Sequence, residues 1–157
     1  MRSLGVSRGI LVCALALAAL PAVAEEAGAA AVDAVWMKAM KANDLDAVVG
    51  CYAPEAVLWL PDAPEARGPK EIRDVYAGYF SNYTVTDASL PNATYQTSSD
   101  LSASWGNFIL TLQPKKGGDP VVLKGRFIVV AKRIGGRWLY VADHASANPP
   151  PPPAAKP

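Results

Sequence analysis

The side chains best suited to chemistry are Asp143 and His144, which are neighbours near the end of the chain. His144 is the only histidine, and imidazole has an ordinary pKa closer to neutrality than any other side chain. Either residue could act as a general acid or base on a bound molecule. The structural alternatives are a hydrogen-bonded histidine at the sheet end or a subunit interface, and an aspartate in a salt bridge or cap. Asp62, which follows Pro61, is a further candidate and could equally be a turn residue.

The adjacency of Asp143 and His144 limits how they can act together. They lie in the segment 137–146, whose composition predicts a β-strand. Successive side chains of a strand point to opposite faces, so only one of the two can face a cavity unless a bulge intervenes. The sequence leaves open which face of this strand is concave.

Three amphipathic segments predict helices. Apolar residues recur at helical spacing over residues 32–40, 45–52 and 72–80. Asn43 is expected to end the first helix, Asp44 to cap the second and Pro54 to end it. Pro69 suits the first position of the third helix.

Strand-forming residues dominate most of the remaining chain. The predicted strands are 56–60, 83–97, 101–112, 121–133 and 137–146. Pro91 marks 83–97 as an edge strand or a bent one, and Gly135-Gly136 predicts a tight hairpin. Three helices followed by a meander of antiparallel strands predict an α+β fold.

Several segments together resemble the nuclear transport factor 2-like superfamily, in its SnoaL-like and ketosteroid-isomerase-like branch. The matching segments are Asn43-Asp44-Leu45-Asp46, Tyr52-Ala53-Pro54-Glu55-Ala56-Val57, Arg67-Gly68-Pro69-Lys70-Glu71-Ile72 and Gly135-Gly136-Arg137-Trp138. The ending Asp143-His144-Ala145-Ser146 is also similar to bacterial homologues of the calcium/calmodulin-dependent kinase II association domain. The resemblance implies a cone-shaped half-barrel, in which a curved antiparallel sheet wraps around three N-terminal helices and encloses a pocket.

The resemblance also allows a test for ketosteroid isomerase chemistry. That reaction uses an aspartate base, with a tyrosine and a protonated aspartate that hold the enolate oxygen. Aligned with this family, the base falls on Leu60, the tyrosine on Trp36 and the second aspartate near Ile128. Leucine cannot take a proton, and isoleucine cannot donate a hydrogen bond. The sequence therefore predicts that ketosteroid isomerase chemistry is absent.

A ligand pocket is the main functional expectation from the aromatic residues. They lie on elements that should converge, and large aromatics provide flat apolar walls, although many of them could simply fill the core. The predicted ligand-binding residues are Trp36, Met40, Tyr52, Trp59, Leu60, Tyr76, Phe80, Trp105 and Phe108. Lys124 and Arg126 share a strand face with Ile128, and exposure or an interface is favoured over contact with a ligand carboxylate.

The two ends of the chain are expected to lie outside the domain. Residues 1–24 have a basic start, an apolar run and an Ala22-Val23-Ala24 cleavage site, which predict a secretory signal peptide and a periplasmic or secreted protein. A small-residue lead-in is predicted at 25–31, the cone domain at 32–147 and a disordered proline-rich tail at 148–157. No stable membrane anchor is expected after cleavage.

Charge and ligand-forming residues restrict the partners. Without Arg2 and Arg8, the 15 basic residues become 13, and against 14 acidic residues the net charge is −1. No basic stripe favours nucleic acid. Because the chain has one histidine and no clustered carboxylates or thiols, neither a metal nor another cofactor is expected.

Three functions remain open at this stage. The first is a secreted protein that binds a small apolar or amphipathic molecule in the cone. The second is a small isomerase, dehydratase or hydrolase that uses His144 or Asp143 as acid or base. The third is an oligomerisation module, a homodimer or higher homo-oligomer, that assembles through the sheet face.

Overall fold

The computed structural model describes residues 28–148. The elements in chain order are α1 (Ala29–Ala42), α2 (Leu45–Val49), β1 (Tyr52–Trp59), β2 (Ala66–Arg67), α3 (Gly68–Asn82), β3 (Tyr83–Ser89), β4 (Thr94–Ser98), β5 (Leu101–Pro114), β6 (Val121–Ile134) and β7 (Arg137–Ala147). The predicted signal peptide at 1–24 and the tail beyond Asn148 lie outside these residues. The lead-in predicted at 25–31 overlaps α1, which begins at Ala29.

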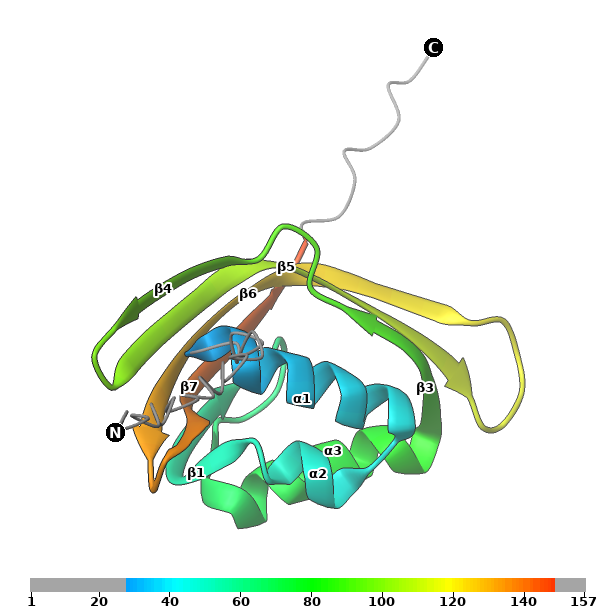
Figure 1. The fold of residues 1–157 in the computed structure, drawn as a ribbon. Helices are drawn as coiled ribbons and strands as arrows, with labels where there is room; N and C mark the ends of the chain where they lie inside the picture. The colour runs from blue at the N-terminus through cyan, green and yellow to red at the C-terminus, as the bar shows by residue number, and fades with distance from the viewer. Residues whose placement is uncertain (1–27, 149–157) are drawn as a thin grey trace, which may run out of the picture.

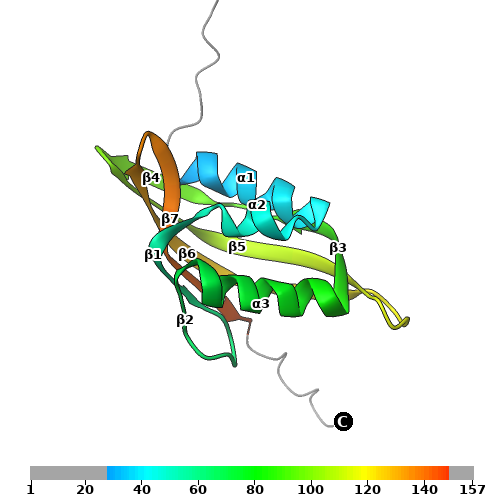
Figure 2. The same cartoon turned by 90° about the horizontal axis from the view of Figure 1, so that it is seen from below.

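A curved, open sheet forms one layer and the helices form the other. The strand order is β2-β1-β7-β6-β5-β3, and β4 also pairs with β5. The strands arch over α1, with α2 and α3 on the same concave side (Figure 1). Figure 2, in which the molecule is seen from below, shows α1 and α3 lying across this concave face. The predicted α+β cone fold is confirmed.

One strand pair corrects the prediction of an antiparallel sheet. Strand β1 runs parallel to β7, so the sheet is mixed. Tight turns force β5, β6 and β7 to alternate in direction. No hairpin joins β1 to β7, so no such constraint applies to that pair.

The corner between α1 and β1 confirms two predicted helix signals and corrects a third. Asn43 adopts a left-handed conformation with φ 54°, and Asp44 caps α2 by accepting a hydrogen bond from the Ala47 amide at 3.0 Å. Tyr52, however, belongs to β1, and Pro54 lies inside that strand. The strand tolerates this proline because the register against β7 shifts between Tyr52 and Val57.

The predicted strand 83–97 is two strands. Its halves, β3 and β4, pair with opposite ends of the long strand β5. The turn between them passes close to Gly106, where an added Cβ would lie 3.0 Å from the carbonyl oxygen of Asn92. This arrangement places Leu90 at the cavity described below.

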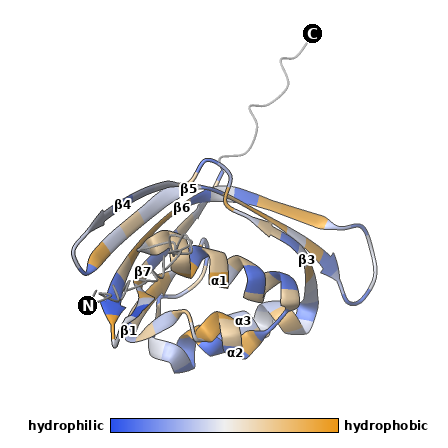
Figure 3. Cartoon of the chain, viewed as in Figure 1, coloured by the Kyte–Doolittle hydropathy of each residue, from blue (hydrophilic) through white to orange (hydrophobic). Residues whose placement is uncertain are grey.

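Burial follows the alternation expected of a one-sided sheet. Polar and apolar residues are interleaved along the helices and the long strands (Figure 3). On β6, Phe127, Val129 and Ala131 are buried on the concave side, while Arg126 and Ile128 are exposed. No helix within residues 28–148 is long and apolar enough to span a membrane.

Candidate functional site

A cavity of about 310 Å³ lies between the helices and the concave face of the sheet. Trp36 and Met40 reach it from α1, and Tyr76 and Tyr79 reach it from α3. The sheet contributes further aromatic, aliphatic and ionisable residues, named below. The volume and the apolar walls suit a small organic molecule.

A bulge in β7 decides which ionisable residue faces this cavity. Opposite Val130 and Ala131 of β6 stand Ala142 and Tyr140, so Val141 is an extra residue in β7. The insertion places Tyr140 and Asp143, three positions apart, on the same cavity wall. His144 consequently points away from the cavity and is exposed.

The carboxylate of Asp143 is held on one side only. The Tyr52 hydroxyl donates to its Oδ2 at 2.7 Å. No hydrogen bond reaches Oδ1 from residues 28–148, and no buried side-chain polar atom among them lacks a partner. Asp143 is 9% exposed and lines the cavity, so Oδ1 is open to whatever occupies that space.

A chain of hydrogen bonds orients this carboxylate from behind. The Trp36 indole N–H donates to the Tyr76 hydroxyl at 3.1 Å, and the hydroxyls of Tyr76 and Tyr52 lie 2.7 Å apart. Because the Tyr52 proton is directed at Asp143, the Tyr76 hydroxyl donates to Tyr52. Three side chains, from α1, α3 and β1, are therefore ordered around one acidic group on β7.

The surroundings of Asp143 raise its pKa from 3.8 to about 6. Desolvation is the main cause, because burial penalises the charged carboxylate. The negative charge of Asp33 adds to the rise, and the hydrogen bond from Tyr52 opposes it. A carboxyl that exchanges its proton near neutrality is suited to acid–base work.

Asp33 is a second buried carboxylate at the cavity that sequence reasoning missed. It is 1% exposed on α1, and it accepts hydrogen bonds from Tyr140 at 2.5 Å and Ser104 at 2.8 Å. Burial raises its pKa, while hydrogen bonds from Tyr140, Ser104 and Tyr95 lower it. The available signal was its position three residues before Trp36 and seven before Met40, on the inner helix face.

The predicted ligand-binding residues fall into three groups. Trp36, Met40, Leu60, Tyr76 and Phe108 line the cavity. Two more are buried behind the wall: Tyr52, which bonds Asp143, and Phe80, whose ring lies 6.4 Å from that of Tyr76. Trp59 and Trp105 are exposed at 39% and 38% and do not line the cavity.

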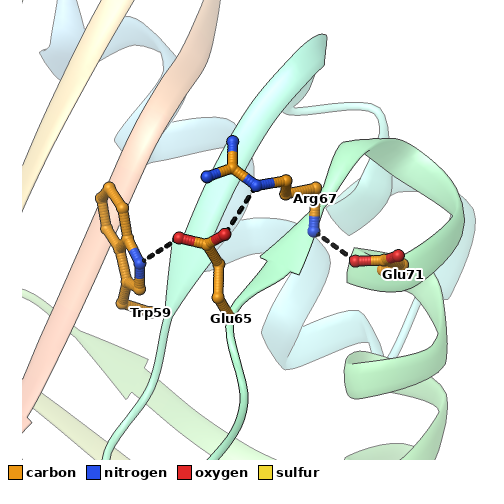
Figure 4. A network of polar contacts seen from close by, with 4 residues as sticks. All are labelled: Trp59, Glu65, Arg67 and Glu71. Carbon is orange, nitrogen blue, oxygen red and sulfur yellow. Dashed lines mark hydrogen bonds and ion pairs between the residues drawn. The ribbon is translucent and has the colours of Figure 1, made fainter.

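Trp59 lies on the outside of β1 because strand alternation turns it away from the cavity. Its indole N–H donates to Glu65 at 2.7 Å, and Glu65 also pairs with Arg67 at 2.6 Å (Figure 4). The amide of Arg67 in turn donates to Glu71 at the start of α3. This polar network holds the β1–β2 edge and leaves the Trp59 ring 6.5 Å from that of His144.

Other candidates also have defined positions. Asp62, with φ 56°, lies within the loop between β1 and β2 and lines the cavity. Of the positions aligned with the isomerase groups, Leu60 and Trp36 line the cavity, whereas Ile128 is 48% exposed on the convex face. Cys51 is buried, and desolvation raises its thiol pKa to about 12.

No group of three or more metal-binding side chains occurs among residues 28–148. The hydrogen-bonded polar groups at the cavity are carboxylates, phenols, one serine hydroxyl and one indole, and Lys124 also belongs to the lining. Their chemistry is proton exchange and hydrogen bonding at the edge of an apolar space.

Comparison with known proteins agrees with this architecture. The SnoaL-like domain model matches residues 34–141. That match covers well over half of the 157 residues, so the chain belongs to the SnoaL-like domain family. No curated protein sequence matches the chain.

Solved structures show the same fold at low sequence identity. A candidate calcium/calmodulin-dependent protein kinase II association domain from Xanthomonas campestris has 22% identity and a TM-score of 0.69, over 76% of this chain and 85% of that one. A ketosteroid isomerase-like protein from Erwinia carotovora atroseptica has 22% identity and a TM-score of 0.66, over 77% and 94%. A nuclear transport factor 2-like protein from Salmonella enterica has 14% identity and a TM-score of 0.68, over 80% and 92%. The predicted superfamily is confirmed.

Proposed function

We propose that this protein binds a small amphipathic molecule in the cone cavity and that Asp143 exchanges a proton with it. The observation that carries the proposal is that only one carboxylate oxygen of Asp143 accepts a hydrogen bond from residues 28–148. Tyr52 fixes one oxygen, and the other oxygen faces an apolar space of ligand size. A positioned base in such a space acts on a bound C–H or O–H group without competition from bulk water.

The reaction class is proton transfer within a bound molecule, as in an isomerisation or dehydration. Asp143 is the acid–base residue, and Tyr52 is a positioning residue that acts through it. His144 has no part in this step, because it lies on the opposite face of β7. The ketosteroid isomerase arrangement is not proposed, since Leu60 and Ile128 stand at two of its three aligned positions.

A deuterium-exchange experiment tests the proposal. A small cyclic ketone such as tetralone is incubated with the protein in heavy water, and loss of its proton signal next to the carbonyl is followed by NMR. We expect the wild type to accelerate exchange and Asp143→Asn to return it to the buffer rate. His144→Ala should exchange at the wild-type rate. If the ketone binds and its exchange is not accelerated, the protein is a ligand-binding protein and the proposed proton transfer is rejected.

The convex face supports a second property, self-association of the chain. Trp105, Ile128, His144 and Trp59 are register neighbours across β5, β6, β7 and β1. All four are exposed, so the sheet presents a row of apolar and aromatic groups to its surroundings. We propose that a second copy covers this row, and light scattering of the purified protein would test it.

A further inference from the structure

The two buried carboxylates at the cavity, Asp33 and Asp143, have no cationic partner among residues 28–148. The ion pairs formed by residues 28–148 join Arg67 to Glu65, Lys70 to Asp74 and Arg73 to Asp46, all on exposed side chains. Asp33 and Asp143 are bonded by hydroxyl groups. A buried carboxylate normally needs a positive partner, because hydroxyl groups solvate the charge without neutralising it.

The cavity is also lined by aromatic rings. Besides Trp36 and Tyr76, its wall includes Tyr79, Phe108, Phe127 and Tyr140. The faces of such rings carry partial negative charge and attract a cation placed over them. The carboxylates and the ring faces therefore both favour a positive charge on the molecule that binds in the cavity.

The other charged residues of the lining do not reverse this preference. Asp62 adds a third carboxylate to the lining, and among residues 28–148 the single basic residue of the lining is Lys124. Lys124 is exposed on β6 between the inward-facing Leu123 and Gly125, so alternation turns its side chain outward. An anionic ligand would meet Asp33 and Asp143 with only this peripheral ammonium to balance them.

We infer that the natural ligand of the cavity carries a positive charge, as an ammonium group on an apolar or aromatic body, and that Oδ1 of Asp143 binds this group. This inference rests on the proposed ligand-binding function of the cavity. It specifies the class of molecule, a small organic amine, in place of a neutral or acidic one. The deep position of Asp143 would seat the ammonium inside and the apolar body against Trp36 and Phe108.

The bound ammonium and the proton compete for the same carboxylate. The pKa of Asp143 is about 6, so most of this carboxylate is charged at neutral pH. Tyr52, Tyr76 and Tyr140 keep their protons, because burial raises their pKa values further above the usual range. Asp33, whose pKa is also raised by burial, and Asp62 are the other carboxyl groups of the lining. Amine affinity should therefore fall as the pH falls through about 6.

A matched ligand series tests the inference. Phenylbutylamine, phenylbutanol and phenylbutanoate share one apolar body and differ only in the charge of the end group. Calorimetry at neutral pH should show the amine binding about tenfold more tightly than the alcohol, with the carboxylate weakest. At about pH 5 the preference for the amine over the alcohol should shrink to about twofold, because Asp143 is then protonated.

Variants assign the effect to its residue. Asp143→Asn should lose the tenfold preference for the amine over the alcohol. Asp119→Asn, in the exposed β5–β6 loop, is the matched control and should keep that preference. The pH series on the wild type needs no variant, so the inference stays testable if Asp143→Asn fails to fold.

The outcomes separate this inference from the proposed function. Equal affinity for the three compounds, or tightest binding of the carboxylate, would agree with a ligand-binding cavity. Either result would overturn the inference that the natural ligand is a cation. A preference for the amine that persists in Asp143→Asn would also overturn it. Absence of binding by all three compounds would count against the cavity as a binding site and against the inference with it.

Discussion

The hydroxyl of Tyr52 lies 2.7 Å from Oδ2 of Asp143, although the two residues are 91 positions apart in the chain. Tyr52 opens β1 and Asp143 lies in the parallel partner strand β7. The parallel strand pair thus brings a phenol from the first strand to the carboxylate of the last. The properties of Asp143 depend on this contact.

Removing the Tyr52 hydroxyl should change both acidity and stability. The hydrogen bond from Tyr52 lowers the pKa of Asp143, so Tyr52→Phe should raise that pKa above about 6. Loss of the bonds to Asp143 and Tyr76 should cost about 1–3 kcal/mol of unfolding free energy. Carboxyl NMR titration and thermal unfolding measure the two effects. Tyr83→Phe, at a half-buried position, is the control, and an unchanged Asp143 titration in Tyr52→Phe would contradict the assignment.

The raised pKa of Asp143 predicts that the protein is less stable at neutral pH than in mild acid. Between pH 3.8 and about 6 the folded state holds a proton that the unfolded state has released. The contribution of this group is therefore fully present below pH 3.8 and is lost as the pH rises through about 6. The difference of roughly two pKa units corresponds to about 3 kcal/mol at most.

Asp143→Asn should remove most of this pH dependence and stabilise the protein at neutral pH. The amide oxygen of asparagine can still accept the hydrogen bond from Tyr52. Asp33 should leave a residual slope of the same sign, because its pKa is also raised. Urea denaturation at several pH values measures the effect. If plots of unfolding free energy against pH are parallel for the wild type and Asp143→Asn, then Asp143 has an ordinary pKa.

Gly125 controls the shape of the cavity wall. A Cβ at this position would lie 2.2 Å from the carbonyl oxygen of Ser146 and 2.5 Å from Cε1 of Phe108. Gly125→Ala should therefore displace the Phe108 ring toward the cavity, weaken ligand binding and destabilise the fold by about 1–3 kcal/mol. Gly78→Ala in α3 is the matched control, since nothing lies within 4 Å of the added carbon. It should raise stability by about 0.5–1 kcal/mol. Equal calorimetric affinity of wild type and Gly125→Ala would contradict this role.

The convex row predicts a specific effect on assembly. Ile128→Asp places a charge in the middle of the exposed row and should shift an oligomer to monomer in light scattering. The cavity should be unaffected, because Ile128 does not line it. Val35→Asp, at another exposed apolar position, is the control. A wild-type protein that is monomeric at all working concentrations would refute self-association through this row.

The fold could be predicted further than the site. Helical periodicity, Asn43, Asp44 and Pro69 gave the helices, because these signals act within a few residues of the structure they determine. The parallel direction of β1 and β7 depends on contacts across the whole sheet, so local pattern did not reveal it. Pro54 was misinterpreted for the same reason, since only the register shift against β7 makes it acceptable in a strand.

The site depended on details of a similar kind. Strict alternation along β7 would have grouped Tyr140 with His144 on one face. The extra residue Val141 instead groups Tyr140 with Asp143. Trp59 was predicted to line the cavity from residue type alone, and strand alternation with a hydrogen bond to Glu65 places it outside. Asp33 was missed because one acidic residue on an apolar helix face was given no weight.

The bulge at Val141 has a consequence for how this chain could change. Deleting that one residue would restore simple alternation along the strand and would keep Tyr140 and Asp143 on the cavity face. Flattening the bulge while keeping all residues would instead exchange the two faces beyond Tyr140 and turn His144 toward the cavity in place of Asp143. The pairing of one residue in the last strand therefore decides between a carboxylate and an imidazole at the cavity, and sequences that share the Asp-His pair should not be assumed to share their chemistry.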